Sequence, residues 1–108
     1  MQKMFVVVNM FKFTCKKHIS YYGCYSENYK EMLECFETNL GIPQVTCVIF
    51  EFEIVKGVGY LTIARNKGIV KATSNYNQAT PAQVRKIKET AQNIIKDILV
   101  IVTEQQGE

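Results

Sequence analysis

Side-chain alternation over residues 45–56 constrains the fold of this chain more than any other feature. Side chains at odd and even positions form two sets with different character, and such alternation predicts a strand. The even set is apolar apart from its threonine, and the odd set is mixed: Thr46, Val48, Phe50, Phe52 and Ile54 against Cys47, Ile49, Glu51, Glu53 and Val55. We therefore expect a long strand with one face in a core and one face more exposed.

Other segments predict partner strands for residues 45–56. Residues 3–15 are rich in Phe and Val and predict a first strand, whereas residues 19–25 fit either an extra strand or a loop. Further along, residues 60–65 and 68–74 predict two strands that are joined by a short hairpin turn at residues 66–68.

The first helix is predicted between residues 26 and 41. Ser26 suits its N-cap, while Gly41 and then Pro43 are placed to end it. Apolar residues recur at helical spacing between these limits: Tyr29, Met32, Leu33, Phe36 and Leu40.

The second helix is predicted to begin at Thr80, with Pro81 in its first turn. A polar stretch at residues 75–79 precedes it and predicts a loop. Its apolar stripe continues from Val84 to Val102, and residues 104–108 are expected to fray. The cations on this helix lie off the stripe, as is typical of a solvated face.

These segments together predict one α+β domain over residues 1–108. Its order is strand, helix, three or more strands, helix. Because an antiparallel sheet can bury one face and expose the other, we expect four to five antiparallel strands with both helices on one face. The opposite face is then the natural place for binding.

Composition and charge restrict the class of protein. The chain has 108 residues and a formal net charge of +3, which is only a mild preference for acidic partners. The apolar run at residues 4–10 is too short to cross a bilayer, and Lys96 and Asp97 interrupt the run at residues 94–102. With no export signal visible, we expect an intracellular protein, cytoplasmic or nuclear or nucleoid, without a membrane association.

The four cysteines are Cys15, Cys24, Cys35 and Cys47, and no two are spaced as CxxC. The cysteines could form a zinc site together with His18, or two of them could form a disulfide. The irregular spacing favours reduced, mostly buried thiols instead. No metal and no cofactor are expected.

No group of residues predicts catalysis. His18 is the only histidine and stands in a basic stretch, where a surface position is more common than a general base. Glu51 and Glu53 could hold a divalent cation, yet two carboxylates on one strand face are more often simply solvated. We therefore expect a binding protein that has no catalytic residues.

The binding face is predicted from alternation in three strands. Each set shares one strand face: Asn9, Phe11 and Phe13; Leu61, Ile63 and Arg65; Lys67, Ile69 and Lys71. Apolar groups can pack on sugars in a minor groove, an amide can bond the base acceptors, and cations can meet phosphates. The alternative is that the apolar members belong to the core.

The chain resembles one lobe of the TATA-binding protein fold. The segments that carry this resemblance cover much of the chain: Val8-Asn9-Met10-Phe11, then Val48 to Phe52, then Leu61 to Val70, then the last helix from Pro81 to Leu99. The resemblance implies a curved half saddle that binds duplex DNA through its open face, with a role in transcription. Because the saddle needs two lobes, it also implies a homodimer or pairing with another lobe.

The resemblance also implies roles for individual residues. Asn9 would read the minor groove, with Phe11 as the apolar residue two positions on. Leu61 and Ile63 would take the places of the leucine and wedge phenylalanine of the third strand. Four later residues would complete this face: Arg65, Lys67, Ile69 and Lys71.

Several positions depart from the family pattern. The third-strand wedge phenylalanine is replaced by Ile63, and the other falls near Val45 or Thr46, so kinking by insertion is in doubt. Glu51 stands at or next to a family arginine, and the segment at residues 16–25 is extra. Two alternatives therefore stay open: a protein-interaction module of the same fold, and a double-stranded RNA binder, whose module also has the order helix, three strands, helix.

Overall fold

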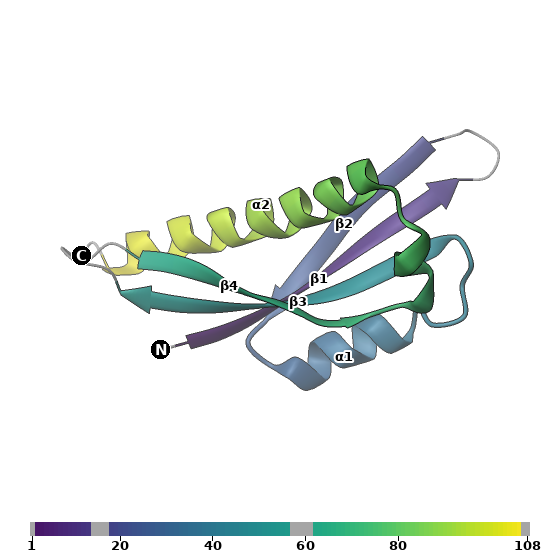
Figure 1. Ribbon diagram of the computed structural model, residues 1–108. Helices are drawn as coiled ribbons and strands as arrows, with labels where there is room; N and C mark the ends of the chain where they lie inside the picture. The colour runs from purple at the N-terminus through teal and green to yellow at the C-terminus, as the bar shows by residue number, and fades with distance from the viewer. Residues whose placement is uncertain (1, 14–17, 57–61, 107–108) are drawn as a thin grey trace.

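The structure is a computed structural model that describes residues 2–13, 18–56 and 62–106. The element order is β1 (Gln2–Phe13), β2 (His18–Ser26), α1 (Tyr29–Glu37), β3 (Val45–Lys56), β4 (Thr62–Ala72), the short 3₁₀ helix η2 (Ser74–Gln78) and α2 (Pro81–Gln106). The strands form one antiparallel sheet in the order β2-β1-β3-β4, with β2 and β4 at its edges (Figure 1). The predicted α+β class and antiparallel sheet are therefore confirmed.

The two helices pack on opposite faces of this sheet, so the prediction that both share one face is wrong (Figure 1). Even-numbered side chains of β1 and β3 form one core with α2: Met4, Val6, Val8, Met10, Val48, Phe50, Phe52, Ile54, Ile87, Ala91, Ile95 and Ile98. Odd-numbered side chains form a smaller core with α1: Phe5, Val7, Met32, Phe36, Val45, Cys47 and Ile49. Because β1 is apolar on both faces and β3 over much of both, each face needs a helix to exclude water.

The ambiguous segment at residues 19–25 lies within a strand, β2, which pairs with β1. Between the helices, the part of the chain that the structure describes has two strands, β3 and β4, and not the three that were predicted. At Gly23 an added Cβ would lie 2.3 Å from the Val7 carbonyl oxygen and 2.9 Å from Cδ1 of Ile94. A side chain does not fit there, which lets α2 pack close to β2.

The predicted hairpin turn at residues 66–68 is also wrong, because β4 runs through it as one strand. The register with β3 shifts twice, and the shift between Glu51 and Phe52 leaves Lys67 of the predicted turn as an extra residue; the second shift, between Ile49 and Phe50, does the same for Val70. Gly68 adopts a φ of 107°, and its N–H donates to the Asn66 side-chain oxygen at 2.8 Å. Bulges and tight turns both favour a glycine with positive φ and an asparagine whose side chain bonds the backbone, so the same residues suit either structure.

The predicted start of the last helix is confirmed. The Thr80 hydroxyl accepts from the Gln83 N–H at 3.2 Å, and the Gln83 side chain accepts from the Thr80 N–H at 3.0 Å, which is a capping box. In α1 the N-cap is Asn28 and not Ser26, which ends β2. None of the described helices is sufficiently long and apolar to cross a bilayer.

Candidate nucleic-acid interface

Most of the predicted site residues lie on the side of the sheet where α1 packs, called here the α1 face. Residues opposite one another in a ladder share a face, so Asn9 and Phe11 lie there with Cys47 and Val45 of the α1 core. By the same reasoning three residues of β4 lie on this face, opposite Val55, Glu53 and Ile49 respectively: Ile63, Arg65 and Lys71. Ile69 pairs with Phe50 of the α2 core, and Leu61 lies outside the described residues.

Asn9 is not exposed as the minor-groove interpretation requires. It retains only 7% of its accessible surface, and its side-chain oxygen accepts a hydrogen bond from Nδ2 of Asn39 at 3.1 Å. The same Asn39 amide donates to the Cys35 carbonyl at 3.0 Å, so Asn9 anchors the chain that follows α1. In this arrangement Asn9 cannot reach the base edges of a duplex.

Phe11 is half-buried, and its ring centroid lies 4.6 Å from that of Phe13 in an edge-on contact. It packs against the α1 core, which makes it part of the support for α1. Phe13 beside it keeps 40% of its surface exposed and faces the His18 ring at 5.8 Å. The aromatic end of β1 is therefore only partly available to a ligand.

A hollow of about 620 Å³ separates α1 from β2, and Asn9, Cys24 and Cys35 are among its lining residues. Burial is the main cause that raises the pKa of the Cys24 thiol, and the neighbouring Cys35 raises it further. Burial also raises the pKa of Cys47, to about 12. A raised pKa keeps a thiol in its protonated form, which is a poor nucleophile and a poor metal ligand.

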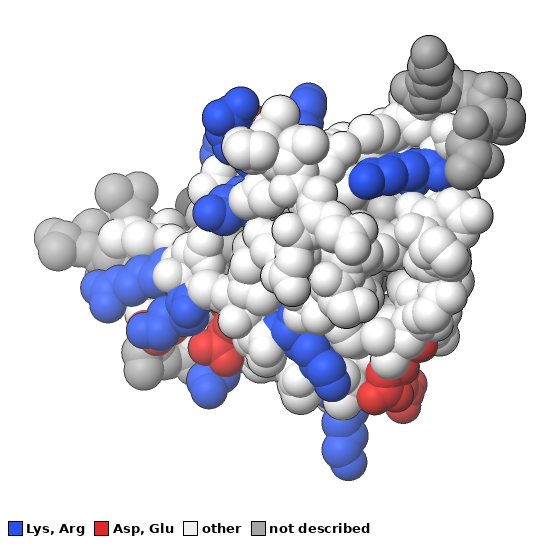
Figure 2. Space-filling model, turned by 45° about the vertical axis from the view of Figure 1, so that its right-hand side comes forward, with Lys and Arg blue, Asp and Glu red and all other residues white. Residues whose placement is uncertain are grey.

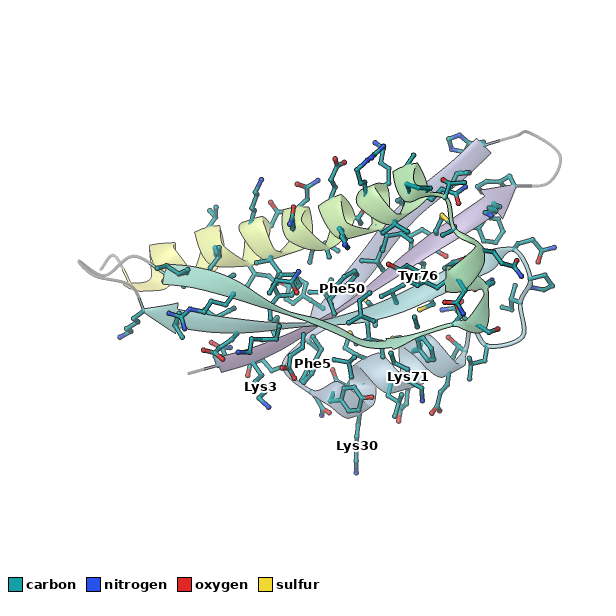
Figure 3. The ribbon with its side chains drawn as sticks, viewed as in Figure 1. Lys3, Phe5, Lys30, Phe50, Lys71 and Tyr76 are labelled. Atoms are coloured by element: carbon teal, nitrogen blue, oxygen red, sulfur yellow. The ribbon has the colours of Figure 1, made fainter. Side chains whose placement is uncertain are left out.

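Four cations lie on the side of the sheet where α1 packs. Three lie on β4 and are exposed: Arg65, Lys67 and Lys71; the fourth is Lys3 on β1. The Lys3 side chain is 70% exposed and that of Lys67 is 49% exposed. Figure 3 shows Lys3 and Lys71 on the same side of the sheet as α1, with Phe5 between the sheet and that helix.

Two carboxylates lie among these cations. Glu51 approaches Lys3 at 4.0 Å, and Glu53 approaches Lys67 at 3.7 Å. In the ladder Glu53 stands directly between Lys3 and Arg65, so charges alternate across three strands. Accordingly, Figure 2 shows basic side chains that are separated by neutral and acidic ones and do not merge into a continuous patch.

Lys71 links the charged end of the face to α1. Its ammonium lies 5.5 Å from the centroid of the Phe36 ring, within the range of a cation–π contact. Phe36 is itself 99% buried, so its ring is a fixed platform. Lys71 and Arg65 have no ion pair among the described residues.

The sequence interpretation missed Lys3 and the charge-balancing role of Glu51 and Glu53. The alternation that places Asn9 on one face of β1 also places Lys3 there, and this signal was available. Within the described ranges, no three His, Cys, Asp or Glu side chains cluster in a way that could hold a metal ion.

Comparisons with protein-family models, with curated proteins and with solved structures find no match to this chain.

Proposed function

We propose that this chain is a nucleic-acid-binding module that contacts the phosphate backbone of duplex DNA through β4. The observation that carries the proposal is the row of exposed cations Arg65, Lys67 and Lys71 along one edge strand. Arg65 lies opposite Glu53 of β3 and Lys71 lies opposite Ile49, so the row is as long as about 13 Å of the neighbouring strand. Phosphates of one DNA strand recur about every 3.4 Å along the helix axis, so such a row can meet several of them.

The proposed mode of binding is backbone contact without reading of the base edges. Asn9 is buried against Asn39, and the wedge positions hold Ile63 and the buried Val45 and Thr46. Contacts to phosphates position a protein on a duplex but carry little sequence information. The half saddle of the TATA-binding protein resemblance and a role in transcription remain predictions, and the phosphate contacts do not depend on them.

The test is binding to a fluorescently labelled duplex of about two helical turns, followed by anisotropy while salt rises from about 50 to 200 mM. We expect the logarithm of the binding constant to fall with the logarithm of salt with a slope of about −2 to −4, for two to four phosphates. Arg65→Glu combined with Lys71→Glu should weaken binding at least about tenfold at the lower salt, because two contacts become repulsive.

The matched control is Lys86→Glu with Lys88→Glu on α2, which changes the net charge equally on exposed positions of the other face. It should bind nearly as well as the unmodified chain. Absence of any binding at low salt, or equal losses in both double variants, would overturn the proposal.

A second candidate is a protein-interaction module that uses the same face. The observation that favours it is the pairing of Glu51 and Glu53 with cations, since carboxylates repel phosphates but suit a partner of mixed charge. This candidate predicts that Lys67→Glu and Lys71→Glu have no effect in the DNA assay. Double-stranded RNA binding is less favoured, because only two described strands separate α1 from α2.

A further inference from the structure

The edge strand β2 lacks the features that usually prevent strands from pairing between molecules. Its residues 19–26 include no Asp, Glu, Lys, Arg or Pro. Its register with β1 is unbroken from the Phe5–Ser26 pair to the Phe13–His18 pair, so no bulge bends it away. Four consecutive residues in its middle are exposed: Tyr22, Gly23, Cys24 and Tyr25. An exposed, regular and uncharged edge is a template for another strand.

The other edge of the sheet, β4, is protected in three ways. It carries the charges of Arg65, Lys67 and Lys71, its register with β3 shifts twice, and Gly68 holds a positive φ. Charges and bulges are common means by which proteins block edge pairing. Of the two edge strands, only β4 therefore has features that prevent pairing with another molecule.

We infer that two copies of this chain pair through antiparallel β2 strands and form one continuous sheet of eight strands. A two-fold axis through Tyr22, the midpoint of His18–Ser26, gives the longest overlap. The axis places Tyr22 opposite its own copy, Tyr21 opposite Gly23, Ser20 opposite Cys24 and Ile19 opposite Tyr25.

These pairs suit both the faces and the sizes of the side chains. Even-numbered residues of β2 share the α1 face with Asn9, and odd-numbered ones share the α2 face with Val8. Antiparallel pairing about Tyr22 keeps each set on its own face, so both copies of α1 lie on one side of the sheet. Gly23, opposite Tyr21, has no side chain and is approached by Ile94 of α2, so no two bulky side chains meet at this pair.

The absence of charge selects a second copy as the occupant. A foreign charged strand would find no complementary charge on β2, and an uncharged copy brings no like charges into opposition. Tyr22 and Tyr25, 49% and 46% exposed, would supply the aromatic area that such a contact needs. The inference is independent of nucleic-acid binding, because β4 remains at the outer edges of the paired sheet.

The test is the mass in solution without nucleic acid, measured by sedimentation equilibrium over a range of concentrations. We expect the full chain to be a dimer, and Tyr22→Lys to raise its dissociation Kd about tenfold or more, because two ammonium groups would face each other across the axis. The matched control is Val70→Lys on the other edge, where the native side chain is similarly exposed at 43%. It should leave the dimer unchanged.

A mixture of variants separates a lost interface from a lost fold. Tyr22→Lys and Tyr22→Glu should each dimerise weakly alone, yet form a tighter heterodimer when mixed, since opposite charges then meet at the axis. A monomeric wild-type chain at all concentrations, dissociation by Val70→Lys, or no heterodimer in the mixture would overturn the inference.

Discussion

Cys47 shows how a single residue can give this protein a measurable dependence on pH. Its side chain is fully buried in the α1 core, and burial raises the pKa of its thiol from 9.0 to about 12. Between these values the unfolded chain loses the proton while the folded chain keeps it. The contribution of Cys47 to stability is therefore complete below pH 9 and is lost as the pH rises toward 12.

The predicted result is that Cys47→Ala costs most below pH 9 and progressively less above it. The difference in unfolding free energy from the wild type should shrink by on the order of 1 kcal/mol per pH unit. Urea unfolding at a series of pH values measures this difference. Ile49→Val, at a neighbouring buried position that does not titrate, should cost the same at each pH. A constant difference for Cys47→Ala would contradict the prediction.

Asn9 illustrates what residue-level sequence reasoning can and cannot give. Alternation in β1 predicted its position on one face correctly, because side-chain direction is a local property of a strand. Its burial depends on Asn39, thirty positions away, and on α1 folding over that face. A polar residue in an apolar strand can be a ligand or an anchor, and only the position of its partner decides between the two.

At the scale of elements, the capping box of α2 is the clearest link from local sequence to stability. Thr80→Ala should destabilise the protein by about 1 kcal/mol, because the Gln83 N–H loses its acceptor at the helix start. Chemical denaturation measures this loss. Thr90→Ala, in the middle of the same helix and bonded only to the Lys86 carbonyl, should change stability by less than about 0.5 kcal/mol. Equal losses of unfolding free energy from the two substitutions would contradict a specific contribution of the cap.

Elements were predicted well where the signal is local and poorly where a long-range partner decides. Thr80 and Pro81 located the start of α2, and alternation located β3. Asn66 and Gly68 suggested a hairpin, but the same residues serve a bulge when the neighbouring strand continues past them. The strand that continues is β3, and nothing within residues 66–68 reports its length.

The whole molecule has a helix on each face of its sheet, and this layering was not predicted. Odd-numbered β1 residues such as Phe5 and Val7 are apolar, which indicated that the second face was not free. Sequence pattern alone does not say which helix covers which face, because both helices are amphipathic. The α1 helix is short, so its face divides into a covered end around Phe36 and a charged end around Glu53.

The charged end of the α1 face predicts that its carboxylates limit nucleic-acid affinity. Glu51→Gln combined with Glu53→Gln would remove two anions and release Lys3 and Lys67 from their ion pairs. If the cations contact phosphates, duplex binding should tighten at low salt, and the salt slope should become steeper by up to about two units. Anisotropy titration with the same labelled duplex measures both quantities.

Net charge alone would also tighten binding, so the control must change it equally elsewhere. Glu89→Gln with Asp97→Asn neutralises two exposed carboxylates of α2, on the opposite side of the sheet from the α1 face. Non-specific attraction would make both double variants tighten alike, whereas local release of Lys3 and Lys67 would steepen the slope only for the pair on β3. Equal gains in affinity would show that binding responds to the overall electrostatic field of the protein and not to the local cations. A gain in affinity for the Glu51 and Glu53 double variant alone would show that these two carboxylates reduce the contacts of Lys3 and Lys67 with phosphates.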